Sequence, residues 1–259
     1  MPPLWSGSIS FGLVNIPVRI LSGSQSNNLD LNMLRKGDLC PVRFERVCRA
    51  DGKTIPNEDI VKGYKYKNGD YVVLTDKDFE DANIARTKSI ELLAFVKEEQ
   101  IDSVYYEKPY FLEPEESAAK PYAVLREALR KSKRVGIARF VIHNREHLGA
   151  LKPWGNMILL NQLRYQEEIR STDKIALPGS EEVKPKEIEM AVQLIGHLAA
   201  DFKPKAYKDA YIEDLMEIIE KKAKGLKVQP RGKAPRPSKA KDLMALLKAS
   251  MKESLKKAA

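Results

Sequence analysis

Alternation of apolar and polar residues marks several segments of this chain as half-buried strands. The first, residues 8–21, changes phase midway, because Ile9 and Leu13 share one parity whereas Ile16 and Val18 share the other. A bulge or corner near residues 14–15 is therefore expected to re-aim the side chains. The same kind of pattern predicts further strands over residues 70–75, 89–97, 103–112, 135–143 and 156–165.

Other stretches have the apolar spacing of amphipathic helices. Thr75, followed three residues later by Asp78, predicts the N-cap of a short helix between two of the strands. Longer helices are expected over residues 120–134, from Pro185 onward, over residues 209–224 and at the C-terminus over residues 239–259. The combination predicts an α+β chain that is rich in β-structure.

Charge is distributed unevenly along the 259 residues, whose net charge is +9. Residues 221–259 carry 13 of the 45 basic and 2 of the 36 acidic side chains, a net of +11, so residues 1–220 carry −2. Within the body, residues 31–67 hold 9 basic and 5 acidic side chains. Segregated basic stretches favour a polyanionic partner, with nucleic acid first and an anionic membrane surface second.

Two basic stretches supply the candidate DNA contacts. Residues 29–67 contain short apolar pieces with little core of their own, and irregular backbone with basic side chains suits phosphate contacts that do not depend on base sequence. The second stretch ends the helix predicted over residues 120–134. The predicted DNA-binding residues are Arg35, Lys36, Arg43, Arg46, Arg49, Lys53, Lys62, Lys65, Lys67, Arg130, Lys131, Lys133 and Arg134.

Motifs for catalysis or metal binding are weak. His143-Asn-Arg-Glu-His147 spells H-x-x-E-H, but its zinc chemistry needs both histidines on one helix, and here strand residues precede a polar hairpin turn. Cys40 and Cys48 lack further ligands at zinc spacing. Arg49 stands where a K-x-D-G nucleotidyl transferase needs a lysine nucleophile. We therefore expect a binding protein rather than an enzyme, with no metal and no cofactor.

Location follows from features that the chain lacks. It has no apolar run of the roughly 20 residues that a spanning helix needs, and its start lacks the pattern of a signal peptide. Two cysteines are too few for a disulfide framework. We expect a cytoplasmic protein, associated with the nucleoid rather than with a membrane.

A series of short segments, in order along nearly the whole chain, resembles the prokaryotic Ku family. The most specific is the opening Trp5-Ser-Gly-Ser-Ile-Ser-Phe-Gly-Leu-Val-Asn-Ile-Pro-Val18. The others are Glu58-Asp-Ile-Val-Lys-Gly-Tyr64, Tyr110-Phe-Leu-Glu-Pro114, Gly136-Ile-Ala-Arg139, Arg145-Glu-His-Leu148 and Asp242-Leu-Met-Ala-Leu-Leu-Lys248.

The resemblance implies a homodimer whose two chains close a ring around double-stranded DNA ends in non-homologous end joining. It implies a core over residues 1–225 that consists of a β-barrel, a bridge at about residues 29–67 and a helical arm at about 185–225. It also implies recruitment and stimulation of the ATP-dependent DNA ligase of that pathway, without enzymatic activity of the chain itself.

The C-terminal region is expected to consist of a basic linker, residues 226–238, and the helix 239–259. That helix is too short to be stable alone, so it should dock on another surface. Its apolar face supplies the candidate partner-docking residues Leu243, Leu246, Leu247 and Met251. Two alternatives remain: a generic nucleic-acid binder that acts through its basic tail, and a zinc hydrolase that uses the H-x-x-E-H motif.

Overall fold

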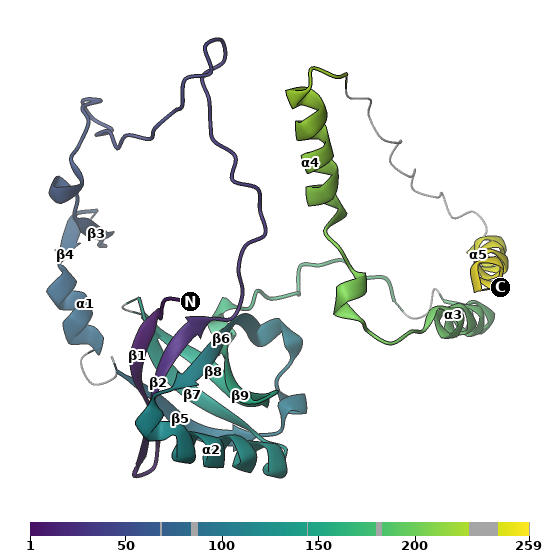
Figure 1. Cartoon of the computed structure of the whole chain (residues 1–259), viewed down its shortest axis with the longest axis horizontal. Helices are drawn as coiled ribbons and strands as arrows, with labels where there is room; N and C mark the ends of the chain where they lie inside the picture. The colour runs from purple at the N-terminus through teal and green to yellow at the C-terminus, as the bar shows by residue number, and fades with distance from the viewer. Residues whose placement is uncertain (68, 84–87, 144, 180–182, 228–242, 259) are drawn as a thin grey trace. The chain divides into compact units, whose positions relative to one another are not determined.

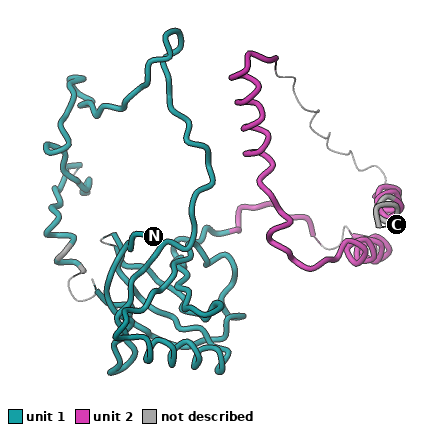
Figure 2. The backbone as a smooth tube through the Cα atoms, in the orientation of Figure 1, with its two compact units in different colours: residues 1–171 teal, residues 172–259 magenta. Residues whose placement is uncertain are grey.

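A computed structural model describes residues 1–67, 69–83, 88–143, 145–179, 183–227 and 243–258. The chain divides into two compact units, residues 1–171 and residues 172–259 (Figure 2). Within the described ranges, no helix combines the length and the hydropathy needed to cross a lipid bilayer.

The chain begins with an antiparallel hairpin of two strands, β1 (Trp5–Phe11) and β2 (Val14–Ser22). The bulge or corner predicted near residues 14–15 is wrong, because the chain reverses completely at Gly12-Leu13, where Gly12 has a φ of 59°. Ile9 and Ile16 face each other across the hairpin and are both buried. The change of parity along the sequence therefore records a reversal of chain direction, with both strands keeping their apolar side chains in the same core.

The hairpin supplies the first two strands of a closed barrel of seven, in the order β1-β2-β6-β9-β8-β7-β5 (Figure 1). Neighbours pair antiparallel except β1 and β5, whose parallel pairing closes the barrel. The α+β, β-rich class predicted from the sequence is thereby confirmed. The remaining barrel strands are β5 (Ser89–Val96), β6 (Tyr106–Pro114), β7 (Val135–Ile142), β8 (Arg145–Trp154) and β9 (Met157–Leu163).

Strand β8 was not predicted from the sequence. The polar residues after His143 suggested a long turn, but pairing with β7 begins already at Arg145, opposite Ile142. Gly149 sits inside β8, where a Cβ would meet the Leu160 side chain at 2.6 Å. A close approach between strands therefore explains a glycine that looked like a turn signal.

Helix α2 (Ala119–Ser132) covers the barrel with the buried residues Tyr122, Leu125 and Leu129. The Tyr122 hydroxyl donates to the Leu112 carbonyl oxygen at 2.6 Å and accepts from the Ile158 backbone N–H at 2.6 Å. Because both partners belong to barrel strands, this hydroxyl fixes α2 to the sheet. The rest of the core comes from inward-facing residues of the strands, among them Ile90, Phe140, Leu151, Ile158 and Leu160.

The pairing registers define two ends of the barrel. Trp5 pairs with Ile20, so the chain leaves β2 at the end where β1 begins, and β5 returns parallel to β1 from that end. We call this the bridge end. Val96, the last residue of β5, pairs with Val135, the first residue of β7. We call this opposite end, where α2 joins β6 to β7, the α2 end (Figure 1).

Between β2 and β5 the chain makes a long excursion with little regular structure (Figure 1). Thr75 caps α1 as the sequence predicted: its hydroxyl oxygen accepts from the Asp78 N–H at 3.4 Å, and its own N–H donates to the Asp78 carboxylate at 2.7 Å. The elements of the excursion are a single 3-10 turn (Asn57–Asp59), the two-stranded sheet of β3 (Lys62–Lys65) and β4 (Tyr71–Leu74), and helix α1 (Asp76–Asn83).

The second unit contains the helices α3 (Pro185–Leu198), α4 (Ala210–Ala223) and α5 (Leu243–Ala258). Pro185 occupies the first turn of α3, and the Asp209 side chain caps α4 by accepting from the Ile212 N–H at 3.3 Å. α5 packs against α3. Residues 228–238 of the predicted linker and 239–242 of the predicted final helix lie outside the described residues.

Candidate nucleic-acid interface

Residues 29–67, which we call the bridge segment, are shaped by two tight turns rather than by packing. Leu34 pairs with Pro41 and Val47 with Thr54 as isolated bridges. In the first turn the Arg35 N–H donates to the Cys40 carbonyl oxygen at 2.9 Å, and in the second the Cys48 N–H donates to that of Lys53 at 2.8 Å. None of the 39 residues from 29 to 67 is buried. The segment therefore displays its side chains without a core of its own.

Three of the predicted DNA-binding cations are neutralised locally. Arg35 pairs with Asp38, Arg43 with Glu45, and Lys53 with Asp51 at 3.7 Å. The hydrogen bond from Arg35 lowers the pKa of the Asp38 carboxyl, and so, more weakly, does the Cys40 N–H. All of these pairs are solvent-exposed, and exposed ion pairs contribute little free energy, so a phosphate could replace the carboxylates.

Two further cations have neutral neighbours and keep their charge. The Arg46 guanidinium donates to the Asn57 side-chain oxygen at 2.8 Å, which joins the second turn to the segment that follows it. The Lys62 ammonium lies 4.6 Å from the centre of the Phe79 ring. Both contacts position a positive group without cancelling it.

The remaining cations of the bridge segment are Lys36, Arg49, Lys65 and Lys67. Among the described residues, none of these four forms an ion pair with a carboxylate. With Arg46 and Lys62 they leave an excess of positive charge on exposed backbone. This arrangement suits phosphate groups, which a long flexible side chain can reach without fixed geometry.

The second basic set, Arg130, Lys131, Lys133 and Arg134, lies at the α2 end of the barrel. The barrel topology therefore does not bring the two predicted sets together. Arg130 is already engaged, donating to Glu127 at 2.7 Å and to the Gly155 carbonyl oxygen at 2.5 Å. Lys133 takes a left-handed conformation, with a φ of 52°, and caps α2 with its N–H.

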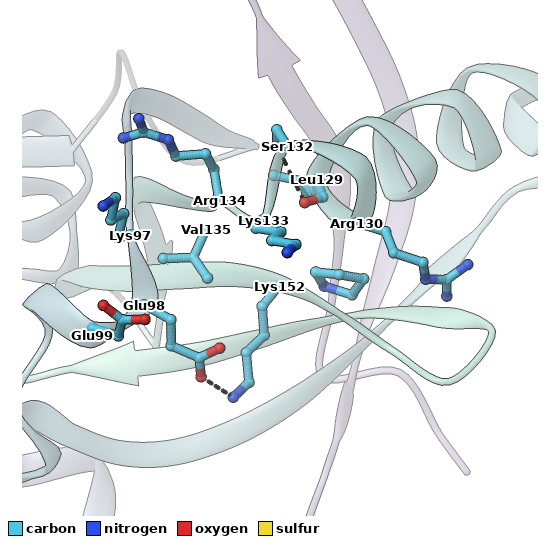
Figure 3. A pocket seen from close by; sticks show the side chains of 11 residues that line it. Lys97, Glu98, Glu99, Leu129, Arg130, Ser132, Lys133, Arg134, Val135 and Lys152 are labelled. Atoms are coloured by element: carbon cyan, nitrogen blue, oxygen red, sulfur yellow. Dashed lines mark hydrogen bonds and ion pairs between the residues drawn. The ribbon is translucent and has the colours of Figure 1, made fainter.

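Arg130, Lys133 and Arg134 line a hollow of about 750 Å³ that we call the basic hollow (Figure 3). Two of its cations, Lys97 and Lys152, were not predicted. Lys97 follows β5 and Lys152 lies in β8, and only the pairing of both strands with β7 brings them beside the end of α2. Lys152 pairs with Glu98 at 2.5 Å, whereas Lys97 and Arg134 form no ion pair with a described residue. No sequence pattern predicts that these cations line one hollow.

The H-x-x-E-H residues belong to the β7–β8 hairpin and not to a helix. His143 is an exposed turn residue with a φ of 51°, and His147 lies within β8 opposite Phe140, its ring 5.6 Å away. Burial and the nearby Arg145 lower the pKa of His147. The hairpin expected from the sequence is present, but Arg145, Glu146 and His147 lie in β8 and not in its turn, and the one-helix geometry that the zinc motif requires is not formed. Among the described residues no cluster of potential metal ligands is present.

The candidate docking residues Leu243, Leu246, Leu247 and Met251 lie on α5, which packs on α3 of the same chain. Leu247 and Met251 are half-buried, whereas Leu243 and Leu246 are exposed. On α3 the half-buried positions follow helical spacing at residues 187, 190, 191 and 194, so this face contacts α5. The other face, with Ile188, Val192 and Ile195, stays exposed.

Comparison with known proteins places this geometry in a family. The model of the Ku70/Ku80 beta-barrel domain matches residues 10–190, which include the end of β1, all of β2, the bridge segment, all the later barrel strands and the start of α3. The chain belongs to the Ku family. The match confirms the family resemblance that the short sequence segments indicated, and it identifies the closed barrel as the family's domain.

Curated relatives extend the match to the second unit. The "Non-homologous end joining protein Ku" of Koribacter versatilis is 39% identical over 248 residues, covering 96% of this chain and 85% of the relative. The protein of the same name from Coxiella burnetii is 37% identical and covers 98% of this chain and 95% of the relative. That from Bacillus subtilis is 37% identical and covers 97% of this chain and 82% of the relative. This chain is therefore a Ku-family protein over nearly its whole length.

Proposed function

We propose that this Ku-family chain binds the ends of double-stranded DNA in non-homologous end joining, as a homodimeric ring without sequence specificity. The observation that carries the proposal is the bridge segment, an exposed and positively charged excursion between two strands of a closed barrel. We infer that the chain acts at the nucleoid and has no catalytic activity of its own in this role. It recruits the ATP-dependent ligase of the pathway.

Phosphate contacts explain binding that does not depend on sequence. Arg46, Arg49, Lys36 and Lys67 lie outside helices and strands, Lys65 ends β3, and none of the five carries a compensating carboxylate among the described residues. Each contact with a phosphate releases a counterion from the DNA, so affinity falls steeply with salt. The bridge segment, all of whose residues are described, contains no aromatic stack of the kind that binds unpaired bases.

The proposed dimer is supported by apolar surface that one chain leaves uncovered. Phe44 is 83% exposed in the bridge segment, and Val192 and Ile195 are exposed on α3. A single chain would leave these side chains in water, whereas a two-fold assembly covers matching surfaces on both copies. A closed pair of chains also explains recognition of ends, because a duplex can enter such a ring only by threading.

The C-terminal helix is the proposed docking element for the ligase. α5 keeps Leu243 and Leu246 exposed while it packs on α3, so these two side chains remain accessible to a partner. We expect Leu243→Glu with Leu246→Glu to reduce stimulation of the ligase and to leave DNA binding unchanged. A ligation assay with the paired end-joining ligase measures the first and a gel shift the second.

A second candidate function is favoured by the net charge of +11 on residues 221–259. A tail with that charge could bind any nucleic acid, including closed circles. Replacing Lys227, Arg231, Lys233, Arg236, Lys239 and Lys241 by glutamine separates the two candidates. If the ring binds ends, this full-length variant retains its preference for linear duplex.

The deciding experiment is a gel-shift titration at fixed salt with one duplex in linear and in covalently closed relaxed form. The full-length protein is compared with the six-glutamine variant, whose net charge over residues 221–259 falls from +11 to +5. We expect both to bind the linear form and neither to bind the closed form at the same concentration. Equal binding of both forms that disappears in the variant would assign DNA binding to the tail and contradict the ring.

A further inference from the structure

A groove runs beside α2, between the helix and the turn of the β1–β2 hairpin. Its volume is about 580 Å³, and we call it the α2 groove. Its walls are Phe11, Val14, Phe95 and Val124, and its floor includes Ile16 and Leu125.

The walls of the α2 groove expose apolar surface on a rigid frame. Phe11 is 43%, Val14 45% and Val124 62% exposed, although Ile16 and Leu125 beneath them belong to the barrel core. The ring of Phe11 packs edge-on against Phe95, with 5.5 Å between centroids, which joins two strands of the barrel. A preformed concave apolar surface is typical of a binding site, because an occupant buries it without first ordering the protein.

Charge around the α2 groove indicates what kind of occupant fits. Lys120 lies at one end of the groove and Arg134 at the other, and none of the described residues that line it is Asp or Glu. Arg134 also lines the basic hollow, where Lys97 and Lys133 add positive charge (Figure 3). The complementary ligand therefore combines apolar side chains with carboxylates.

The length of α2 and its end of the barrel also fit a partner helix. α2 has 14 residues and is therefore about 21 Å long, so a partner helix of about four turns could lie along it. The groove belongs to the α2 end of the barrel, and the bridge segment leaves from the opposite end. DNA held by the bridge segment would leave the groove accessible.

We propose that the α2 groove is a docking site for an acidic amphipathic helix of a partner protein. The apolar side chains of that helix fill the groove, and its carboxylates contact Lys120 and Arg134. This interaction goes beyond DNA binding and does not require it. A second copy of this chain is the competing occupant, because α4 is itself amphipathic and carries Glu213, Glu217 and Glu220.

The test uses two labelled 16-residue helical peptides with leucines at identical helical positions and with either glutamates or lysines at the others. Fluorescence anisotropy measures their binding to the full-length protein. The glutamate peptide is expected to bind at least about tenfold more tightly than the lysine peptide. High salt should remove most of that difference, because the contacts with Lys120 and Arg134 are screened.

Matched variants locate the peptide on the protein. Val124→Glu places a charge in the groove and is expected to weaken binding of the glutamate peptide by at least about tenfold. Val104→Glu changes another exposed valine, just before β6 and away from the groove, and should leave binding unchanged. Arg134→Glu should reverse the preference between the two peptides. All variants are checked for folding, oligomeric state and binding of linear duplex.

Three results would overturn the proposal. Equal binding of both peptides would remove the electrostatic argument, and equal binding by Val124→Glu and Val104→Glu would place the peptide elsewhere. A Val124→Glu variant that becomes monomeric would identify the second copy as the occupant. Because linear-duplex binding is measured separately, failure of the docking site leaves the proposed end-binding function standing.

Discussion

The barrel and the bridge segment of the same unit are stabilised in opposite ways. In the barrel every strand has two neighbours, and side chains such as Phe140 and Leu160 are almost completely buried. In the bridge segment no residue is buried, and two short turns hold the backbone by local hydrogen bonds. The barrel can therefore fold on its own contacts, whereas the bridge segment gains its contacts from a ligand or a second chain.

The largest effect is expected from a cavity in the barrel. Phe140→Ala removes a ring from the core and should lower the free energy of unfolding by about 3–5 kcal/mol. Phe44→Ala, in the bridge segment, should change it by less than about 0.5 kcal/mol because the side chain is 83% exposed. Urea denaturation at low protein concentration measures both. Equal losses would show that the bridge segment has its own packed core.

Charge reversal in the bridge segment comes next and acts on DNA rather than on stability. Arg43→Glu with Arg46→Glu should weaken binding of linear duplex by about 30-fold and reduce the slope of log affinity against log salt by about 2. Gel shifts at several salt concentrations measure both quantities.

The matched control reverses Lys131 and Lys133 at the α2 end. We predicted DNA contacts for both sets, and the opposite ends of the barrel allow them to be tested separately. If only the Lys131 and Lys133 reversal changed the slope of log affinity against log salt, the DNA would contact the α2 end and not the bridge segment.

A smaller effect is expected where α2 is fixed to the barrel. Tyr122→Phe leaves the buried Ile158 N–H without its acceptor and should cost about 1–2 kcal/mol of stability. Tyr106→Phe is the control, because its buried hydroxyl has no hydrogen-bond partner among the residues that the structure describes. Thermal denaturation should therefore show a loss for the first variant only. Equal melting temperatures for the two variants would mean that the Tyr122 hydroxyl does not stabilise the attachment of α2.

The smallest expected effect is a dependence on pH. Burial lowers the pKa of His147 in the folded barrel below its unfolded value of about 6.5, so protonation favours the unfolded chain. The stability that neutral His147 contributes is present above the unfolded pKa of about 6.5 and is lost as the pH falls toward the lower folded pKa. His147→Gln should reduce the loss of melting temperature between pH 7.5 and 5. The exposed His143 is the control, and an equal reduction in His143→Gln would contradict the assignment.

Sequence patterns predicted most of the fold because the strands and helices carry their own periodicity. Strands such as β7 and β9 and the cap at Thr75 follow from local residue chemistry. Strand β8 was missed because its polar beginning and Gly149 look like a turn, and only the contact with Leu160 explains the glycine. The hairpin was mistaken for one bent strand because a reversal and a bulge both change the parity.

The candidate site was predictable only where its residues are close in sequence. The bridge segment could be found from its excess of Arg and Lys and its lack of core. The basic hollow could not be found, because Lys97 follows β5, Lys133 follows α2 and Lys152 lies in β8, and only sheet pairing and the packing of α2 bring them together. The α2 groove depends in the same way on Phe11, Phe95 and Val124, which are far apart in the chain.

The central claim is that two chains enclose the duplex, and a topological trap tests it most directly. The protein is loaded on a linear duplex, the ends are ligated to form a circle, and the complex is washed at about 1 M salt, where phosphate contacts are screened. A threaded ring remains on the circle and is released when a restriction enzyme cuts it. Release from the intact circle at the same rate as from linear duplex would contradict the enclosed-duplex account.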